Sequence, residues 1–134
     1  MSAHIYIDTS FIYALADEGD PKHSRATRIH DDCLDLLCLS THVVGEAMSL
    51  LTKRFSKSIA LDIGRGLVEE EKVWVITPSD QDFADAWALF TRYPDWDLDL
   101  IDSISFALMH REGIEQALTF DSHFAQMGFT ALPG

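Results

Sequence analysis

Short apolar runs alternate with longer amphipathic stretches along the whole chain. Runs that are apolar on both faces are typical of strands buried in a parallel sheet. They predict strands at residues 3–8, 34–39, 73–77 and 117–120, and a short edge strand at 129–132. Helical spacing and capping residues predict helices at residues 9–16, 21–30, 41–51, 56–71, 79–90 and 98–110. Strands separated by helices indicate one α/β domain, residues 1–134, with a mainly parallel sheet of four to five strands.

The composition is that of a folded domain. The chain has 134 residues, of which 47% are hydrophobic, enough to form a core. No apolar run approaches the roughly 18 residues of a spanning helix, and the first residues do not resemble a secretory signal. We therefore expect a soluble cytoplasmic protein with no membrane partner. Cys33 and Cys38 are expected to be reduced core residues.

The charge balance is strongly acidic. Ten Lys and Arg side chains against 22 Asp and Glu side chains give a formal net charge of −12. A protein that binds nucleic acid by charge alone is expected to be basic, so the net charge argues against this class without deciding the function. The charge does not exclude an enzyme that binds the phosphates through metal ions and one local strip of basic residues.

Four isolated acids lie beside apolar segments. Asp8 ends the first predicted strand, Glu46 lies within an apolar helix, Asp102 follows Leu-Asp-Leu-Ile, and Asp121 follows Leu-Thr-Phe. Each carboxylate is costly to desolvate alone, but converging carboxylates raise one another's pKa or bind a cation. Asp8 and Asp121 both follow strands, and ligands of open α/β sheets bind beyond the carboxyl ends of strands. The pattern predicts a site for a hard metal ion, and therefore phosphate chemistry.

These acids and their neighbours resemble the PIN-domain nucleases, and within them the toxin ribonucleases of VapBC-type toxin–antitoxin pairs. The resemblance covers nearly the whole chain and depends on four segments in order. They are Asp8-Thr9-Ser10, Thr41-His42-Val43-Val44-Gly45-Glu46, Asp102-Ser103-Ile104-Ser105-Phe106-Ala107 and Thr119-Phe120-Asp121-Ser122-His123-Phe124. Asp20-Pro21-Lys22-His23 and the ending from Gly128-Phe129 to Pro133 are typical of one branch.

The resemblance implies a fold, an activity and partners. The fold would be a PIN-like three-layer sandwich, with helices flanking the mainly parallel sheet. The activity would be metal-dependent hydrolysis of RNA phosphodiester bonds by the toxin of a toxin–antitoxin pair. The partners would be an RNA substrate, a cognate antitoxin protein and a second copy of the chain in a homodimer.

The resemblance also implies roles for the acidic residues. Asp8, Asp102 and Asp121 would bind Mg²⁺ or Mn²⁺, and Glu46 would hold a metal-bound water. Asp99, three residues before Asp102 on the predicted helix, could be an additional ligand. Three hydroxyl side chains would orient the carboxylates: Thr9, Ser10 and Thr119.

Histidine replaces an acid at one position of the family pattern. His123 stands where other branches carry Asp or Asn, so the choice between one and two metal ions stays open. We interpret His23 and His123 as structural hydrogen-bonding residues.

Two basic clusters are candidates for RNA contact. Lys53, Arg54 and Lys57 follow the helix of Glu46, and this cluster is preferred because its helix runs from the acidic site. The second cluster lies at helical spacing: Lys22, Arg25 and Arg28. We interpret Trp74, Trp87 and Trp96 as core or dimer contacts.

Two other functions fit parts of this pattern. A PIN-like module for protein association, with weak or no catalysis, is favoured by the acidic charge and disfavoured by the intact set of acids. A phosphatase of the haloacid dehalogenase type needs Asp-x-Asp after the first strand. The segment Asp8-Thr9-Ser10 lacks the second carboxylate, so we disfavour that class.

Overall fold

Strands and helices alternate along the chain, as the apolar pattern predicts. The computed structural model describes residues 3–133, apart from the side chain of Asp35. The strands are β1 Ile5–Ile7, β2 Leu37–Ser40, β3 Trp74–Ile76, β4 Gln116–Leu118 and β5 Thr130–Leu132. The helices are α1 Thr9–Ala16, α2 His23–Cys33, α3 Thr41–Arg54, α4 Lys57–Val68, α5 Asp80–Arg92, α6 Leu100–Glu112 and α7 His123–Gln126. A 3₁₀ turn, η1, covers Leu34–Leu36.

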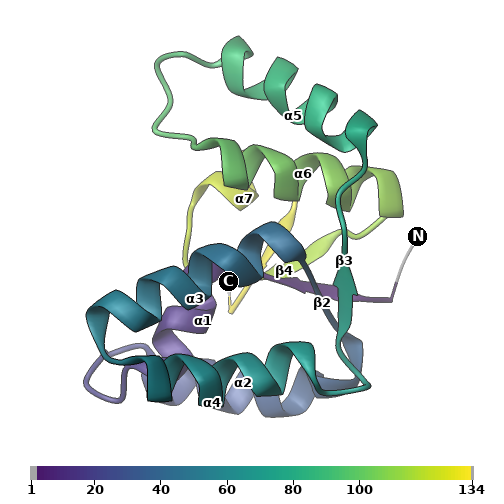
Figure 1. Cartoon of the computed structure of the whole chain (residues 1–134). Coiled ribbons are helices and arrows are strands. Elements are labelled where there is room, and N and C mark those ends of the chain that lie inside the picture. Colours follow the sequence, from purple (N-terminus) through teal and green to yellow (C-terminus); the bar gives the residue numbers. More distant parts are fainter. Residues whose placement is uncertain (1–2, 134) are drawn as a thin grey trace.

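The strands form one parallel sheet in the order β3-β2-β1-β4-β5. The central strand β1 is fully buried, consistent with its apolar sequence. Figure 1 shows α5, α6 and α7 grouped in the upper part of the molecule and α1 to α4 in the lower part, with the strands between them. The prediction of an α/β sandwich with a parallel sheet is therefore confirmed.

Tertiary contacts attach α5 and α6 to the rest of the fold. The Tyr6 hydroxyl on β1 lies 2.7 Å from the Ser105 hydroxyl on α6, in a buried hydrogen bond. The Arg111 guanidinium on α6 donates two hydrogen bonds, of 2.7 and 2.8 Å, to the buried carboxylate of Asp82 on α5. The Arg111 guanidinium holds the pKa of Asp82 below its usual range. Neither the Tyr6–Ser105 nor the Arg111–Asp82 contact was predicted from the sequence. The first joins residues that are 99 positions apart, and the second joins two helices separated by a loop.

Several predicted element boundaries are wrong by a few residues. The second strand was predicted from residue 34, but Leu37 is the first residue of β2 that pairs with β1, opposite Ile5. The residues before it have no strand opposite them and form η1. The second helix begins at His23, two residues after Pro21, and the fourth ends at Val68.

The loop between α5 and α6 has the predicted length but lies two residues later in the chain. Helix α5 continues to Arg92 and ends before Pro94, whose ring disfavours helical backbone in the preceding residue. Helix α6 begins only at Leu100, because Asp99 is its N-cap.

The cysteines and tryptophans differ in burial. Cys38 is buried and Cys33 half-buried, and neither forms a disulfide, as predicted. Burial raises the pKa of the Cys38 thiol to about 12. Trp74, Trp87 and Trp96 are 38%, 51% and 39% exposed, so interpreting them as core residues is wrong.

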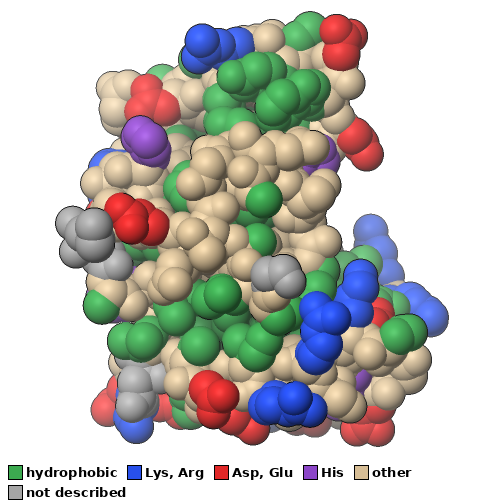
Figure 2. Space-filling view, turned by 180° about the vertical axis from the view of Figure 1, so that it is seen from behind, with side chains coloured by type: hydrophobic (Ala, Val, Ile, Leu, Met, Phe, Trp, Pro, Cys, Tyr) green, Lys and Arg blue, Asp and Glu red, His purple; other side chains and the backbone are tan. Residues whose placement is uncertain are grey.

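Charge is unevenly distributed over the surface. Figure 2 shows Lys and Arg side chains gathered toward the lower right of the face seen from behind, whereas acidic side chains are scattered around the outline. Between residues 3 and 133, no helix is both long and apolar enough to cross a membrane.

Candidate metal centre

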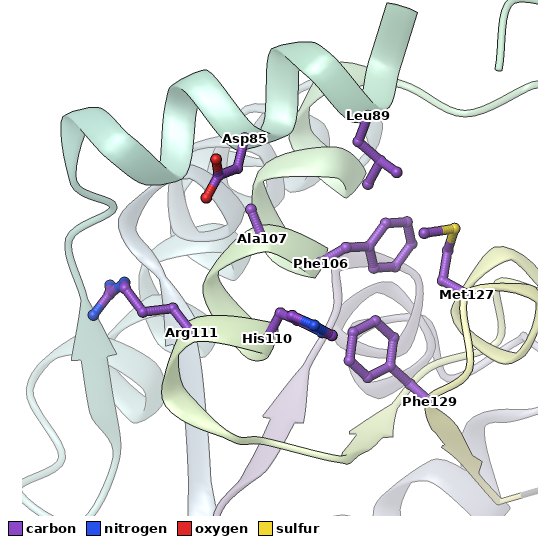
Figure 3. A pocket seen from close by; sticks show the side chains of 8 residues that line it. All are labelled: Asp85, Leu89, Phe106, Ala107, His110, Arg111, Met127 and Phe129. Carbon is purple, nitrogen blue, oxygen red and sulfur yellow. The ribbon is translucent and has the colours of Figure 1, made fainter. Parts of the chain in front are cut away.

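An apolar cavity of about 380 Å³ opens between α5, α6 and the segment that follows α7. Figure 3 shows Leu89, Phe106, Met127 and Phe129 pointing into it. Its polar lining residues are Asp85, His110 and Arg111. None of the four acids singled out in the sequence lines this cavity, so their chemistry belongs to another part of the molecule.

The pairing of β1 with β4 brings Asp8 and Asp121 to the same edge of the sheet. Ile7 on β1 lies opposite Leu118 on β4, and the Asp8 backbone N–H donates a 3.1 Å hydrogen bond to the Leu118 carbonyl. Asp8 directly follows β1, and Asp121 lies three residues after β4. The carboxyl ends of two adjacent parallel strands therefore supply two of the four acids.

One oxygen of the Asp8 carboxylate accepts several hydrogen bonds. Asp8 Oδ2 accepts from the Ser10 hydroxyl at 2.7 Å, the Thr119 hydroxyl at 3.0 Å and the Ser10 backbone N–H at 3.3 Å. The last bond makes Asp8 the N-cap of α1. Within residues 3–133, the other oxygen, Oδ1, accepts no hydrogen bond, so it is available to a cation.

The same two hydroxyls position the segment that contains Asp121. The Thr119 hydroxyl accepts a 2.9 Å bond from the Asp121 backbone N–H, and the Ser10 hydroxyl accepts a 3.0 Å bond from the Phe120 N–H. Each hydroxyl donates to Asp8 and accepts from this segment. Ser10 and Thr119 thus join the first and fourth strand ends into one unit.

Asp102 comes to the centre from α6. The residue is 8% exposed, and its backbone N–H donates a 2.7 Å hydrogen bond to Asp99 Oδ1. Asp99 therefore precedes α6 as its N-cap, and the prediction that it lies within the helix is wrong. The physical reason is that a short acid at the N-cap satisfies a backbone N–H that the helix itself leaves unpaired.

The pKa directions show that the acids lie within electrostatic reach of one another. Burial, followed by the negative charges of Asp99, Asp8, Asp121 and Glu46, raises the pKa of Asp102 to about 9. Burial also raises the pKa of Asp8, although the Ser10 and Thr119 hydroxyls partly oppose the rise. An uncompensated cluster of this kind favours either a bound proton or a bound cation.

Glu46 on α3 belongs to the same group of charges. Its pKa is raised by burial and by the charges of Asp99 and Asp8, and the nearby Thr9 hydroxyl opposes that rise. The Thr9 hydroxyl is buried and makes no hydrogen bond of good geometry. The structure therefore brings together all four predicted acids, as well as Asp99 and the three predicted hydroxyl residues.

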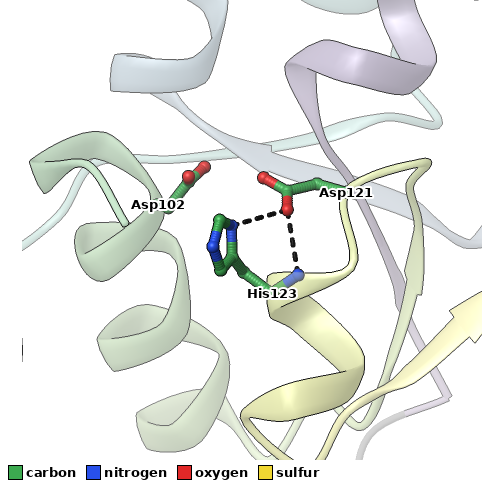
Figure 4. A group of neighbouring side chains, drawn as sticks. All are labelled: Asp102, Asp121 and His123. Atoms are coloured by element: carbon green, nitrogen blue, oxygen red, sulfur yellow. Dashed lines mark hydrogen bonds and ion pairs between the residues drawn. The ribbon is translucent and has the colours of Figure 1, made fainter. Parts of the chain in front are cut away.

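His123 also belongs to this centre, although the sequence analysis left its role at the metal position open and interpreted it as a structural hydrogen-bonding residue. Asp102, Asp121 and His123 each offer a ligand atom within 4.8 Å of the others. Figure 4 shows the three side chains gathered between α6 and the segment around α7. The His123 backbone N–H donates to Asp121 Oδ1 at 2.9 Å. His123 Nδ1 lies 2.7 Å from the same oxygen, within ion-pair distance but outside hydrogen-bond geometry. The signal in the sequence was the spacing Asp-x-His directly after a strand.

The donor set fits a divalent cation. Carboxylate oxygens suit Mg²⁺ and Mn²⁺, and an imidazole nitrogen is accepted by first-row transition metals. Among the described residues, Asp8 Oδ1 accepts no hydrogen bond and the buried His123 Nδ1 has no hydrogen-bond partner. This cluster could bind a metal ion.

The preferred basic cluster lies along α3 from the acids. Lys53 and Arg54 are in the last turn of α3, and Lys57 is the first residue of α4. Lys53 is seven residues after Glu46, or about 10 Å along the helix axis at 1.5 Å per residue. Contact of this cluster with RNA stays a prediction.

The family of the chain follows from comparison with known proteins. The PIN domain family matches residues 5–130, and the chain belongs to this family. It is similar along nearly its whole length to the 23S rRNA-specific endonuclease VapC20 of Mycobacterium tuberculosis. The two are 31% identical over 126 residues, 93% of this chain and 95% of VapC20. Ribonuclease VapC26 of the same organism is 27% identical over 135 residues, 95% of this chain and 98% of VapC26.

Solved structures agree with this assignment. The crystal structure of VapC20, described as a sarcin-ricin loop cleaving toxin, has a TM-score of 0.88 at 30% identity and covers 94% of this chain and 96% of its own. A chain of a toxin–antitoxin complex from Klebsiella pneumoniae has a TM-score of 0.63 at 20% identity, with 88% and 87% covered, and supports the fold alone. The predicted resemblance to PIN-domain ribonucleases of the VapC type is confirmed.

Proposed function

We propose that this protein is a metal-dependent endoribonuclease that hydrolyses RNA phosphodiester bonds and is the toxin of a toxin–antitoxin pair. The observation that carries the proposal is the convergence of Asp8, Glu46, Asp102 and Asp121 from four separate elements on one buried acidic centre. Similarity to two named ribonucleases over more than nine-tenths of the chain supports the same activity.

Asp8, Asp102 and Asp121 are the proposed ligands of Mg²⁺ or Mn²⁺, and His123 is a further candidate. When bound, the metal ion supplies charge neutralisation at the phosphate and lowers the pKa of a water molecule. Asp99 is the weaker candidate, because one of its oxygens already caps α6.

The remaining residues of the centre would orient groups and move a proton. Burial raises the pKa of the Glu46 carboxyl, and this carboxylate would hold the attacking water and accept its proton as a general base. Ser10 and Thr119 would keep the Asp8 carboxylate in one orientation through Oδ2. This arrangement leaves Oδ1 for the cation.

The proposed partners follow from the relatives. VapC20 is named for 23S rRNA and for the sarcin-ricin loop, so ribosomal RNA is the first substrate to test, and the cytoplasm is the compartment in which the protein would meet it. A cognate antitoxin would restrain the protein. Phe83 and Trp87 on α5, 49% and 51% exposed, are candidates for the contact in a homodimer.

The test is cleavage of purified ribosomal RNA by the full chain with Mn²⁺, with EDTA, and after Asp8→Asn. Asp62→Asn, the same substitution at an exposed position of α4, is the matched control. We expect metal-dependent cutting that Asp62→Asn retains and Asp8→Asn loses by about 10³-fold or more, with both variants folded. Undiminished cutting by Asp8→Asn would contradict the proposal. Absence of both cutting and Mn²⁺ binding would favour the protein-association module.

A further inference from the structure

Two cationic side chains of α2 and its N-cap lie over an aromatic ring beside the acidic centre. Lys22 Nζ is 5.1 Å and Arg25 Cζ is 5.9 Å from the centroid of the Phe120 ring. Phe120 lies between Thr119 and Asp121 in the segment that contributes to the centre. We call these three residues, Lys22, Arg25 and Phe120, the basic platform. Cations over an aromatic face are attracted by the ring quadrupole, so the ring helps to fix where they stand.

The Phe120 ring is itself held firmly relative to Asp8. The buried Phe11 ring stacks on it with centroids 5.4 Å apart and an interplanar angle of 9°. The Phe120 backbone N–H donates to the Ser10 hydroxyl, which in turn donates to Asp8 Oδ2. A single hydroxyl therefore connects the platform to a proposed metal ligand.

The platform borders a hollow that reaches the acidic centre. Arg25, Phe120 and Asp121 line a surface hollow of about 210 Å³, with Ala131 and Pro133 among its other lining residues. A guanidinium and a proposed metal ligand thus share one hollow. An RNA strand lying in this hollow would contact the Arg25 guanidinium beside the phosphate that reacts at the acidic centre.

The charge of Lys22 and Arg25 is not neutralised by neighbouring acids. Across residues 3–133, neither side chain forms an ion pair with a carboxylate, although the chain contains 22 acidic residues and only ten Lys and Arg. Arg111 and Arg65, by contrast, are paired with acids. Unpaired guanidinium and ammonium groups are the usual protein donors to phosphate oxygens.

We propose that the basic platform is the subsite that binds the phosphodiester backbone of the RNA strand next to the bond that is cut. This inference rests on the proposed nuclease function. Arg25 and Lys22 bind backbone phosphates, while Phe120 and Phe11 keep the two cations at a fixed place beside Asp121. The subsite also accounts for RNA binding by a protein of net charge −12, because only a local group of cations is needed.

The test compares two double variants that each remove two positive charges. Lys22→Gln/Arg25→Gln removes the cations of the platform. Arg65→Gln/Arg92→Gln is the matched control, with exposed arginines on α4 and α5 that belong to neither basic cluster. Each full-length protein is assayed for binding of a fluorescent mixed-sequence single-stranded RNA in EDTA over a range of salt, for cleavage in Mn²⁺, and for Mn²⁺ affinity by calorimetry.

The platform variant is expected to raise Kd and KM about tenfold or more, with kcat and Mn²⁺ affinity within twofold of the unmodified protein. Two lost phosphate contacts should make the slope of log K against log salt shallower by about 1.4, at 0.7 per contact for a single strand. The control variant should change Kd and KM less than threefold. Equal effects of the two variants, or loss of Mn²⁺ affinity in the platform variant, would overturn the proposal.

The outcomes separate this inference from the proposed function. If the unmodified protein cuts RNA and the platform variant behaves like the control, the subsite is wrong and the nuclease stands. If the unmodified protein binds RNA through the platform but does not cut it, the subsite stands and the nuclease proposal fails. If the unmodified protein binds RNA neither in EDTA nor in Mn²⁺, the subsite proposal is overturned.

Discussion

Single side chains in the acidic centre perform two tasks at once. Asp8 caps α1 with one oxygen and leaves the other free of hydrogen bonds, and Asp99 caps α6 while its charge raises the pKa of Asp102. Capping stabilises the fold, whereas gathering carboxylates destabilises it when no cation is bound. The balance between these effects should be visible in the pH dependence of stability.

Asp102→Asn is expected to stabilise the metal-free protein at neutral and alkaline pH. The Asp102 pKa is about 9 in the folded protein and roughly 3.9 when unfolded. The folded state therefore binds more protons between these values, and stability falls as pH rises through this window. Asparagine removes that loss, so the melting temperature in EDTA should rise by a few degrees at pH 8 and by much less at pH 5. A variant that melts lower at every pH, with Asp62→Asn unchanged, would contradict this.

At the scale of elements, α3 approaches α4 closely at one glycine, Gly64. A Cβ added to Gly64 would lie 2.7 Å from Met48 Sδ on α3, whereas one added to Gly66 would meet nothing within 4 Å. Both glycines lower the helix propensity of this segment. Only at Gly64 does a neighbouring side chain lie close enough to oppose a larger residue.

The pair of glycines gives a matched test of this packing. Gly66→Ala is expected to stabilise the protein by about 0.5–1 kcal/mol, because alanine loses less backbone entropy on folding. In Gly64→Ala the flexible end of the Met48 side chain must shift to admit the new Cβ, and this shift offsets part of that gain. Urea unfolding should therefore show a smaller stabilisation for Gly64→Ala than for Gly66→Ala. Equal midpoints would mean that α3 and α4 adjust freely.

At the scale of the whole molecule, the centre joins parts of the chain that are distant in sequence. Asp8 follows β1, Glu46 is on α3, Asp102 is on α6 and Asp121 follows β4. A cation that binds them stabilises the folded state only, because the unfolded chain does not bring these carboxylates together. Metal binding should accordingly raise the free energy of unfolding of the whole domain.

Mn²⁺ or Mg²⁺ is expected to raise the melting temperature. At a free concentration 100 times Kd the stabilisation is about 2.7 kcal/mol, which for a chain of this size is roughly 8 °C. Asp8→Asn should reduce the shift to that produced by NaCl of the same ionic strength, while Asp62→Asn should retain it. An equal shift in Asp8→Asn would show that the cation acts by general screening. Differential scanning calorimetry measures all three proteins under one set of conditions.

The sequence by itself determined the order of elements and the parallel α/β class, because strand apolarity, helical spacing and caps are local properties. The family came from the resemblance of four ordered segments that contain the four acids. The acids could be predicted because Asp8 and Asp121 follow apolar strands. Their roles at the centre stay proposals. The predicted boundaries of elements were less accurate where pairing between strands decides them. The second strand was predicted from residue 34, but Leu34–Leu36 form η1 and the first residue of β2 paired with β1 is Leu37.

Only the tertiary structure decided the strand order, the exposure of the tryptophans, and the positions of Asp99, His123 and the basic platform. The physical reason is that these features depend on contacts between residues far apart in the chain. The Thr119 hydroxyl bonds to Asp8 across 111 positions of sequence, and the two cations near Phe120 come from residues about a hundred positions earlier. Local propensity contains no information on such pairs, which form when the buried sheet brings β1 and β4 side by side.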